Sequence, residues 1–256
     1  MFKRIASVFS LGSGGFPTRT DGIPTSSNGA SSFHLRWETP REPLREASAI
    51  FEVIEPPAVD SLYFWALQVG FAEGNELRGA AHVGLQHHPA YPHNGAVNWG
   101  GYQPDGTELT GSEAKLPSTL ANANTRDYQW HPNRQYRYRV SPSPAGGWRA
   151  TITDETTGEE TIIRDLYVKA DRIVAPMVWT EAFCDCAASS VAVRWSDLTV
   201  VDAQHQIYAI RRTQTSYQRF EAGGCTNTSS DTDHIGFIQR TNTQRSTPDG
   251  ESLRLG

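Results

Sequence analysis

The 256-residue chain is poor in cysteine and methionine and has no long hydrophobic run. No apolar stretch approaches the roughly 18–20 residues that span a bilayer, so no membrane span is expected. The three cysteines, Cys184, Cys186 and Cys225, are an odd number, so at most one intramolecular disulfide can form. If the protein is exported, Cys225 pairs with Cys184 or Cys186; three reduced thiols are the alternative.

The chain also lacks the charge and loops that phosphate ligands require. Its net charge is −5, which gives no positive field for nucleic acid, so nucleic acid is not an expected partner. Gly12, Gly14 and Gly15 have no strand before them and do not form a nucleotide-binding loop. A Gly-x-Ser-x-Gly nucleophile elbow is absent, which removes the usual signature of serine hydrolases.

The N-terminus is polar and weakly patterned. Lys3 and Arg4 precede a short apolar stretch over residues 5–11, similar to a signal peptide but without a convincing cleavage site. Localisation therefore stays open between secreted and cytoplasmic. Residues 10–32 are rich in Ser, Gly, Thr and Pro, so residues 1–32 are predicted to be a flexible leader.

Helical periodicity is absent over any useful length, whereas short alternating segments between turn residues are frequent. Strands are predicted over residues 48–55, 61–72, 80–88, 96–102, 135–141, 148–154, 160–165, 173–183 and 190–201. The sequence Glu73-Gly74-Asn75-Glu76 predicts a hairpin turn. We therefore expect one antiparallel all-β domain over residues 33–202.

The composition changes after Asp202, where Gln, Thr, Ser and Asn dominate. Residues 203–256 are predicted to be a C-terminal extension with two possible edge strands, at 206–211 and 235–239. The last dozen residues are expected to be disordered.

Several strand motifs resemble those of a known fold. They are Leu67-Gln68-Val69-Gly70-Phe71, Val83-Gly84-Leu85-Gln86, Trp99-Gly100-Gly101-Tyr102, Tyr136-Arg137-Tyr138-Arg139-Val140, Gly147-Trp148 and Val193-Arg194-Trp195-Ser196-Asp197-Leu198. They resemble the concanavalin A-like lectin/glucanase sandwich and, more closely, bacterial jelly-roll domains of unknown function. The resemblance spans about residues 45–202 and implies an antiparallel jelly-roll β-sandwich. It transfers no activity, because this fold carries lectins, glycosidases, lyases and adhesion modules.

One strand combines aromatic and acidic residues. Along residues 173–183 and just beyond, Trp179, Glu181, Phe183 and Asp185 alternate onto one predicted face. An aromatic ring beside a carboxylate suits sugar recognition, since the ring stacks on the sugar and the carboxylate accepts hydroxyl protons. Glu181 and Asp185 would be the catalytic pair of an enzyme, but Phe183 interrupts the acid-x-acid-x-acid run of the glucanases. The alternative is a core role for Trp179 and Phe183.

Amides and arginines supply a second set of candidates. Gln68 and Gln86 lie opposite the apolar faces of their strands, and Arg139 and Arg194 alternate in the same way. Together with Trp99, which follows a Pro- and Gly-containing loop, they could line a ligand-binding face. Mutually satisfied amides and solvent-facing arginines are the structural alternative.

No metal site is predicted. His82, His87, His88 and His93 are close in sequence but lack a metal-binding spacing. Asp231 and Asp233 could bind Ca²⁺ but lack an ordered calcium loop.

These patterns favour non-catalytic binding of a carbohydrate or similar polyhydroxylated ligand, and they lean against an enzyme. A glycoside hydrolase or polysaccharide lyase is the first alternative, and a structural or adhesion module is the second. The predicted binding residues are Gln68, Gln86, Trp99, Arg139, Trp179, Glu181 and Arg194, with a glycan as the partner and no cofactor.

Overall fold

A computed structural model describes residues 17–256, and almost all regular structure in that range is β-strand. The strands are joined antiparallel in one continuous hydrogen-bonded sheet. This sheet folds into two layers that meet where Leu44 pairs with Ile173. Two short 3₁₀ turns, η1 (Pro92–Asn94) and η2 (Phe220–Ala222), are the helical elements of the described part. The all-β antiparallel prediction is confirmed.

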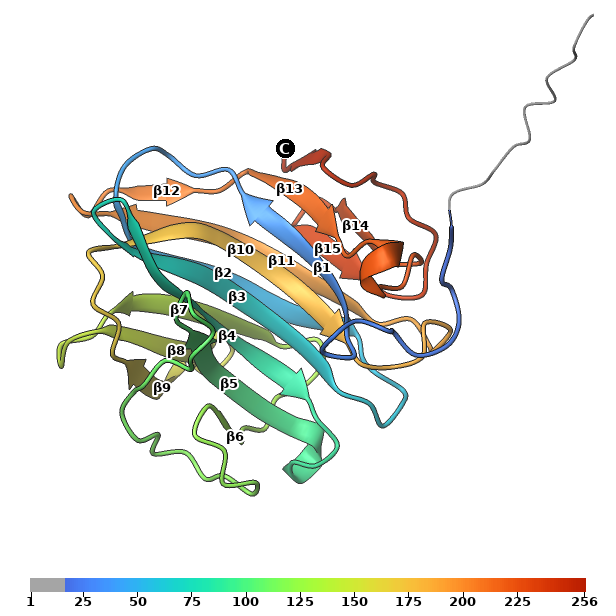
Figure 1. The fold of residues 1–256 in the computed structure, drawn as a ribbon, viewed down its shortest axis with the longest axis horizontal. Coiled ribbons are helices and arrows are strands. Elements are labelled where there is room, and N and C mark those ends of the chain that lie inside the picture. The colour runs from blue at the N-terminus through green and yellow to red at the C-terminus, as the bar shows by residue number, and fades with distance from the viewer. Residues whose placement is uncertain (1–16) are drawn as a thin grey trace, which may run out of the picture.

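The strands of the first layer can be followed in Figure 1, in which all but β16 are labelled. Its strands, in spatial order, are β16 (Ser252–Arg254), β13 (Arg212–Tyr217), β1 (Ser31–Trp37), β10 (Arg172–Ala182), β3 (Tyr63–Glu73), β4 (Glu76–His87), β5 (Gly95–Tyr102) and β6 (Thr125–Asp127). The β3–β4 hairpin turns at Gly74, whose φ of 56° suits glycine, as the turn sequence predicts.

The second layer overlaps the first in the view of Figure 1. Its strands, in spatial order, are β14 (Ser229–Thr232), β15 (Phe237–Arg240), β11 (Ala192–Asp202), β2 (Leu44–Glu55), β7 (Gln135–Pro142), β8 (Trp148–Asp154) and β9 (Glu159–Leu166). A short strand, β12 (Ile207–Ala209), pairs antiparallel with the C-terminal part of β11.

Aromatic side chains fill the space between the layers. The ring of Phe51 on β2 lies 5.5 Å from that of Trp65 on β3 and 4.8 Å from that of Trp195 on β11. The Tyr138 hydroxyl of β7 accepts a hydrogen bond from the Leu85 amide of β4 at 3.1 Å. Burial of these rings contributes most of the stabilisation between the layers, because the hydrophobic free energy scales with the apolar area removed from water.

The segment before β1 is held in place rather than free. Thr25 donates its amide to the Gly223 carbonyl, and the Arg19 amide donates to the Thr226 hydroxyl. β1 begins at Ser31, so the predicted flexible leader does not extend to residue 32. The signal-like stretch over residues 3–11 lies outside the described residues.

The C-terminal extension is ordered by pairing with both layers. β13 lies between β1 and β16, and β15 pairs with β11. Strand β16 occupies residues that were expected to be disordered, so that expectation is wrong. Its short ladder is supported by Leu253, which is buried.

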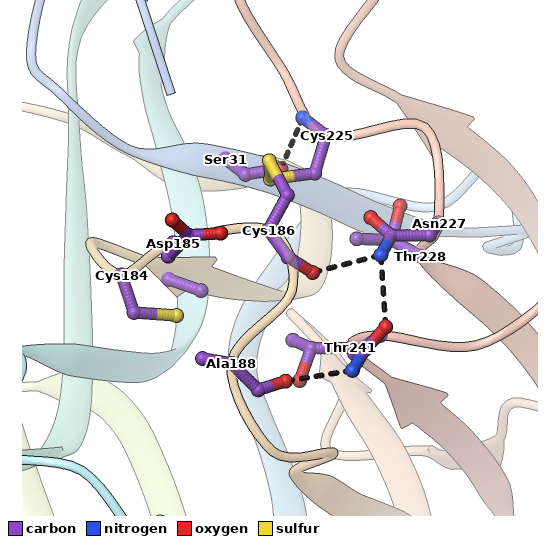
Figure 2. A pocket seen from close by; sticks show the side chains of 11 residues that line it. Ser31, Cys184, Asp185, Cys186, Ala188, Cys225, Asn227, Thr228 and Thr241 are labelled. Atoms are coloured by element: carbon purple, nitrogen blue, oxygen red, sulfur yellow. Dashed lines mark hydrogen bonds between the residues drawn. A yellow bond between two sulfur atoms is a disulfide. The ribbon is translucent and has the colours of Figure 1, made fainter. Parts of the chain in front are cut away.

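A disulfide ties the extension to the end of β10. Cys186 and Cys225 are bonded (Figure 2). Cys184 is a buried thiol that accepts a hydrogen bond from the Tyr63 hydroxyl at 3.0 Å. Asn227 reinforces the junction by donating to the Cys186 carbonyl at 2.7 Å. This is one of the two pairings that the sequence left open.

Candidate functional site

The candidate site is the outer face of the first layer, meaning the side chains of β1, β10, β3, β4 and β5 that point away from the core. Strand register sets these side chains in three parallel rows. The rows are Ser32–Glu181–Phe64–Gln86–Ala96, then His34–Trp179–Ala66–Gly84–Asn98, then Arg36–Met177–Gln68–His82–Gly100.

A bulge in β10 decides which of its side chains reach this face. The register shifts between Val174 and Met177, where Ala175 has φ of 46° and Pro176 follows. A bulge adds a residue and reverses the alternation. Ile173, Trp179 and Glu181 are separated by even numbers of residues and would share one face in a regular strand. Because of the bulge, Ile173 faces the core, whereas Trp179 and Glu181 face outward.

Trp179 is the centre of an aromatic cluster on the outer face. Its ring lies 4.9 Å from Phe64, 5.6 Å from His82 and 6.4 Å from His34. Its indole nitrogen donates to Gln68 Oε1 at 3.1 Å. Only 4% of Trp179 is exposed, so its ring is a floor of the face and offers no free surface for stacking.

Glu181 is the acidic group of this face. Its Oε1 accepts hydrogen bonds from the Ser32 hydroxyl at 2.9 Å and the Asn28 amide at 3.3 Å. Burial raises the pKa of this carboxyl above its ordinary value, although the two hydrogen bonds favour the charged form. No Lys, Arg or His within residues 17–256 forms an ion pair with it.

Two histidines flank the cluster as neutral groups. Burial lowers the pKa of His82 and of His34 to about 4. For His34, the hydrogen bond with the Ser216 backbone opposes this effect and the charge of Arg36 adds to it. Above about pH 4 these imidazoles are therefore mostly uncharged beside Trp179.

The β4 side of the face carries amide oxygens without partners. Gln86 is 5% exposed and its Oε1 has no hydrogen-bond partner in the described part of the chain. Asn98 donates to the Thr125 hydroxyl at 2.9 Å, but its Oδ1 is likewise buried and unpartnered. Buried acceptors of this kind favour a ligand that brings N–H or O–H donors.

Of the seven residues predicted to bind ligand, four share the outer face and three do not. Gln68, Gln86, Trp179 and Glu181 lie on it. Trp99 is fully buried on the core side of β5, so the prediction that it overhangs the site is wrong.

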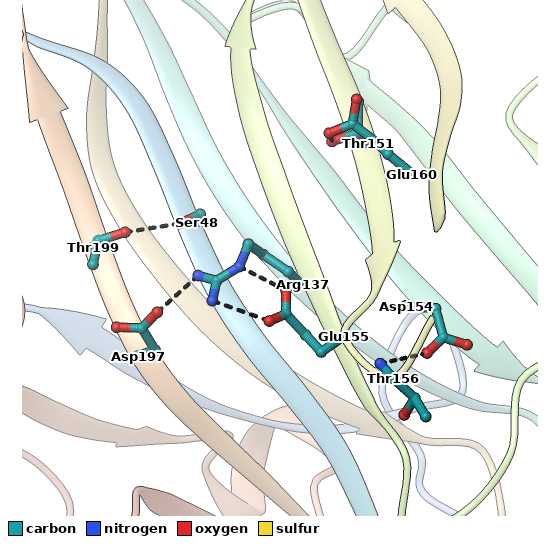
Figure 3. A network of polar contacts seen from close by, with 9 residues as sticks. All are labelled: Ser48, Arg137, Thr151, Asp154, Glu155, Thr156, Glu160, Asp197 and Thr199. Carbon is teal, nitrogen blue, oxygen red and sulfur yellow. Dashed lines mark hydrogen bonds and ion pairs between the residues drawn. The ribbon is translucent and has the colours of Figure 1, made fainter. Parts of the chain in front are cut away.

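Arg139 and Arg194 belong to the second layer, away from the outer face of the first. Arg139 pairs with Glu46 at 2.6 Å, and Arg194 bridges Glu52 and Asp233, each at 2.8 Å. The same surface holds the network in which Arg137 joins Glu155 to Asp197 (Figure 3). These guanidinium groups are already satisfied by carboxylates.

Asp185 does not share a strand face with Glu181. β10 ends at Ala182, and the Asp185 carboxylate accepts the Ala187 amide at 2.8 Å in the turn beyond it. Phe183 likewise follows the end of β10. The predicted pair of Glu181 and Asp185 is therefore replaced by a single carboxyl on the outer face.

Residues 17–256 contain no group of three or more His, Cys, Asp or Glu side chains placed to hold a metal ion. Asp233 is engaged by Arg194 and by the Ile235 and Gly236 amides instead. Within the same range no helix has the length and apolarity required to cross a bilayer.

Sequence reasoning missed the two groups that contact Glu181. Asn28 and Ser32 fell within the polar stretch interpreted as a leader, because their composition is that of a linker. The signal that could have revealed them is the apolar alternation of Phe33, Leu35 and Trp37, which begins immediately after Ser32.

Comparisons with known proteins gave matches only among solved structures. No protein-family model and no curated protein matches the chain. A scytalido-glutamic peptidase bound to a peptide-based transition-state analogue is 10% identical, with a TM-score of 0.42 over 87% of this chain and 99% of that one. The eqolisin-family peptidase SCP-B, in complex with the tripeptide Ala-Ile-His, gives the same values.

The prediction of a non-catalytic carbohydrate binder is wrong. Trp99 and Trp179, which it required as exposed stacking surfaces, are buried. The leaning against an enzyme is corrected as well, because it relied on the missing acid-x-acid-x-acid run, which is a criterion for glucanases alone.

Proposed function

We propose that the chain is a hydrolase of peptide-like amide bonds, with Glu181 as its acid–base group. The observation that supports this proposal most strongly is the environment of the Glu181 carboxyl. The side chain is half-buried, has no cationic partner in the described chain, and accepts hydrogen bonds from Ser32 and Asn28 through one oxygen. Its Oε2 makes no hydrogen bond within residues 17–256 and is not among the buried atoms that lack a partner. That oxygen is where a water molecule would be activated.

A single carboxyl suits amide hydrolysis better than glycoside hydrolysis. Glycosidases use two carboxyl groups, about 5–5.5 Å apart when they retain configuration and about 6.5–9.5 Å apart when they invert it. Along the row of Glu181, the next acidic residue in the described chain is Asp127, four strands away. With strands about 4.8 Å apart, this places the two residues on the order of 19 Å from each other.

One carboxyl can serve amide hydrolysis in two steps. As the base, Glu181 takes a proton from the attacking water; as the acid, it returns that proton to the leaving nitrogen. Ser32 donates its one hydroxyl proton to Glu181 and so orients the carboxyl. Asn28 donates one N–H to the same oxygen, and its second N–H would stabilise the developing oxyanion.

The rest of the outer face would bind the substrate. Phe64 and Trp179 are almost fully buried and form the apolar layer beneath the residues that a substrate would contact. The unpartnered oxygen of Gln86 would accept an N–H group of an extended peptide once its side chain turns outward. Gln68 is part of the same surface. The finer fold assignment, a concanavalin-like jelly roll, stays a proposal beside this one.

The proposal is tested with a library of internally quenched fluorescent peptides incubated with the purified chain. Cleavage that vanishes in Glu181→Gln supports it. Glu46→Gln is the matched control, because Glu46 forms an ion pair with Arg139 in the second layer. Cleavage that persists in Glu181→Gln would assign the chemistry to another group.

A further inference from the structure

Two arginines face the interior where the edges of the two layers approach each other. Arg126 lies on β6 and pairs in register with the core residue Val97. Arg164 lies on β9 and pairs with the core residue Ala150. Arg164 Nη1 donates to the Ala123 carbonyl at 2.7 Å, which ties β9 to the segment just before β6.

Neither guanidinium group has a carboxylate partner in the described chain. The ion pairs within residues 17–256 include Arg137, Arg139, Arg149 and Arg194, but neither Arg126 nor Arg164. The Nε atoms of both are buried without a hydrogen-bond partner. Only 6% of Arg164 is exposed.

This arrangement is energetically costly without a bound partner. A buried charge destabilises a fold unless it is paired, and two like charges repel each other. Burial lowers the pKa of Arg164, and the nearby charge of Arg126 lowers it further. The largest opposing influence on this pKa is the charge of Glu108, whose carboxylate accepts a hydrogen bond from Asn124 at 3.4 Å.

We propose that Arg126 and Arg164 form a binding site for a small oxyanion, held between β6 and β9. Guanidinium groups bind oxyanions through paired N–H donors, and the two unpartnered Nε–H groups provide them. Gly111 leaves room for the Arg164 guanidinium, because a Cβ there would lie 2.4 Å from Nη2. A hollow of about 260 Å³ beside β9 provides an approach from the Arg164 side. Its wall includes Arg164, Lys115 and Arg149, together with the Glu113 and Asp165 side chains. The Asp165 carboxylate is paired with Arg149.

The oxyanion site is distinct from the Glu181 site. Arg126 projects to the core side of the first layer, whereas Glu181 projects outward. Four strand spacings, on the order of 19 Å, separate β6 from β10. Anion binding and hydrolysis can therefore fail independently of each other.

Isothermal titration calorimetry of the full chain with sodium sulfate, sodium phosphate or sodium acetate tests this proposal. Sodium chloride at matched ionic strength is the reference. We expect saturable binding of at least one oxyanion and about a tenfold or greater loss of affinity in Arg126→Gln. Tighter binding of sulfate or phosphate than of acetate would identify a tetrahedral oxyanion, and the reverse order would identify a carboxylate.

Arg126→Gln is the primary variant because the Arg126 side chain makes no hydrogen bond within the described chain, so we expect the variant to fold; circular dichroism checks this. Arg139→Gln is the matched control, since Arg139 is paired with Glu46, and it should bind the anion as the wild type does. Without oxyanion, Arg126→Gln should melt higher than the wild type; in saturating oxyanion the order should reverse. Heat signals equal to those of chloride, or unchanged affinity in Arg126→Gln, would overturn the proposal.

Discussion

The indole nitrogen of Trp179 donates to Gln68 Oε1 at 3.1 Å across the adjoining strands β10 and β3. This bond fixes the ring that forms the floor of the outer face. It also uses the one polar atom of a side chain that is otherwise packed against Phe64 and the two histidines.

The hydrogen bond between Trp179 and Gln68 should therefore contribute to stability. Gln68→Leu leaves a buried donor unsatisfied, at a cost of about 1–3 kcal/mol. Trp179→Phe loses the same bond and also part of a buried ring, so its cost includes a cavity and only the coupling isolates the bond. Urea denaturation of both single variants and the double variant measures the coupling. Additive effects would show that the bond contributes nothing.

Glu181 should lower stability at neutral pH. The pKa of Glu181 is higher in the folded protein than its ordinary value of 4.5 in the unfolded chain. The contribution of Glu181 to the free energy of unfolding is therefore complete below pH 4.5 and is lost as the pH rises through the folded pKa. Glu181→Gln should then be more stable than the wild type at pH 7.5, and the difference should shrink towards about pH 4. Denaturant titrations at both pH values check this. A difference that is constant with pH would contradict it.

His82 should stabilise the fold at neutral pH and lose this effect in acid. The pKa of His82 is about 4 in the folded protein and 6.5 ordinarily. Its contribution to the free energy of unfolding is therefore present above pH 6.5 and is lost as the pH falls towards 4. His82→Gln should lose less free energy of unfolding across that range than the wild type. The exposed His131, replaced in the same way, is the control. Parallel curves for the two variants would show that His82 does not titrate in this window.

The Cys186–Cys225 disulfide should stabilise the fold by restricting the unfolded chain. The bonded residues are 39 apart in sequence, for which loop-closure entropy gives about 4 kcal/mol. Cys225→Ser should lower the free energy of unfolding by about 2–4 kcal/mol. Cys184→Ser should change it less, because Cys184 forms no covalent bond. Equal effects of the two variants would contradict this account.

The sequence predicted most of the strands because alternation is a local property. The predicted strands 135–141 and 148–154 agree closely with β7 and β8.

Trp99 was misplaced because β5 is buried on both sides, so alternation does not distinguish core from surface there. Its replacement by Ala should cost about 3–5 kcal/mol as a core cavity.

The site was less predictable than the fold because its partners are distant in sequence. Glu181 contacts Asn28 and Ser32, which are 153 and 149 residues away. Arg139 and Arg194 were predicted to bind ligand because the sequence does not reveal their partners. In the structure, β2 places Glu46 beside Arg139 and Glu52 beside Arg194. The bulge at Ala175, which sets the orientation of β10, has no signal beyond the proline that follows it.

The central claim is that Glu181 performs acid–base chemistry on a peptide bond. The most direct measurement is the rate of peptide cleavage between about pH 3 and pH 8 by the wild type, Glu181→Gln and Glu46→Gln, each first shown to be folded by circular dichroism. The account predicts cleavage by the wild type and Glu46→Gln, and a loss of about 10²–10⁴-fold in Glu181→Gln. Undiminished cleavage in Glu181→Gln, or no cleavage of any peptide by the wild type, would contradict it.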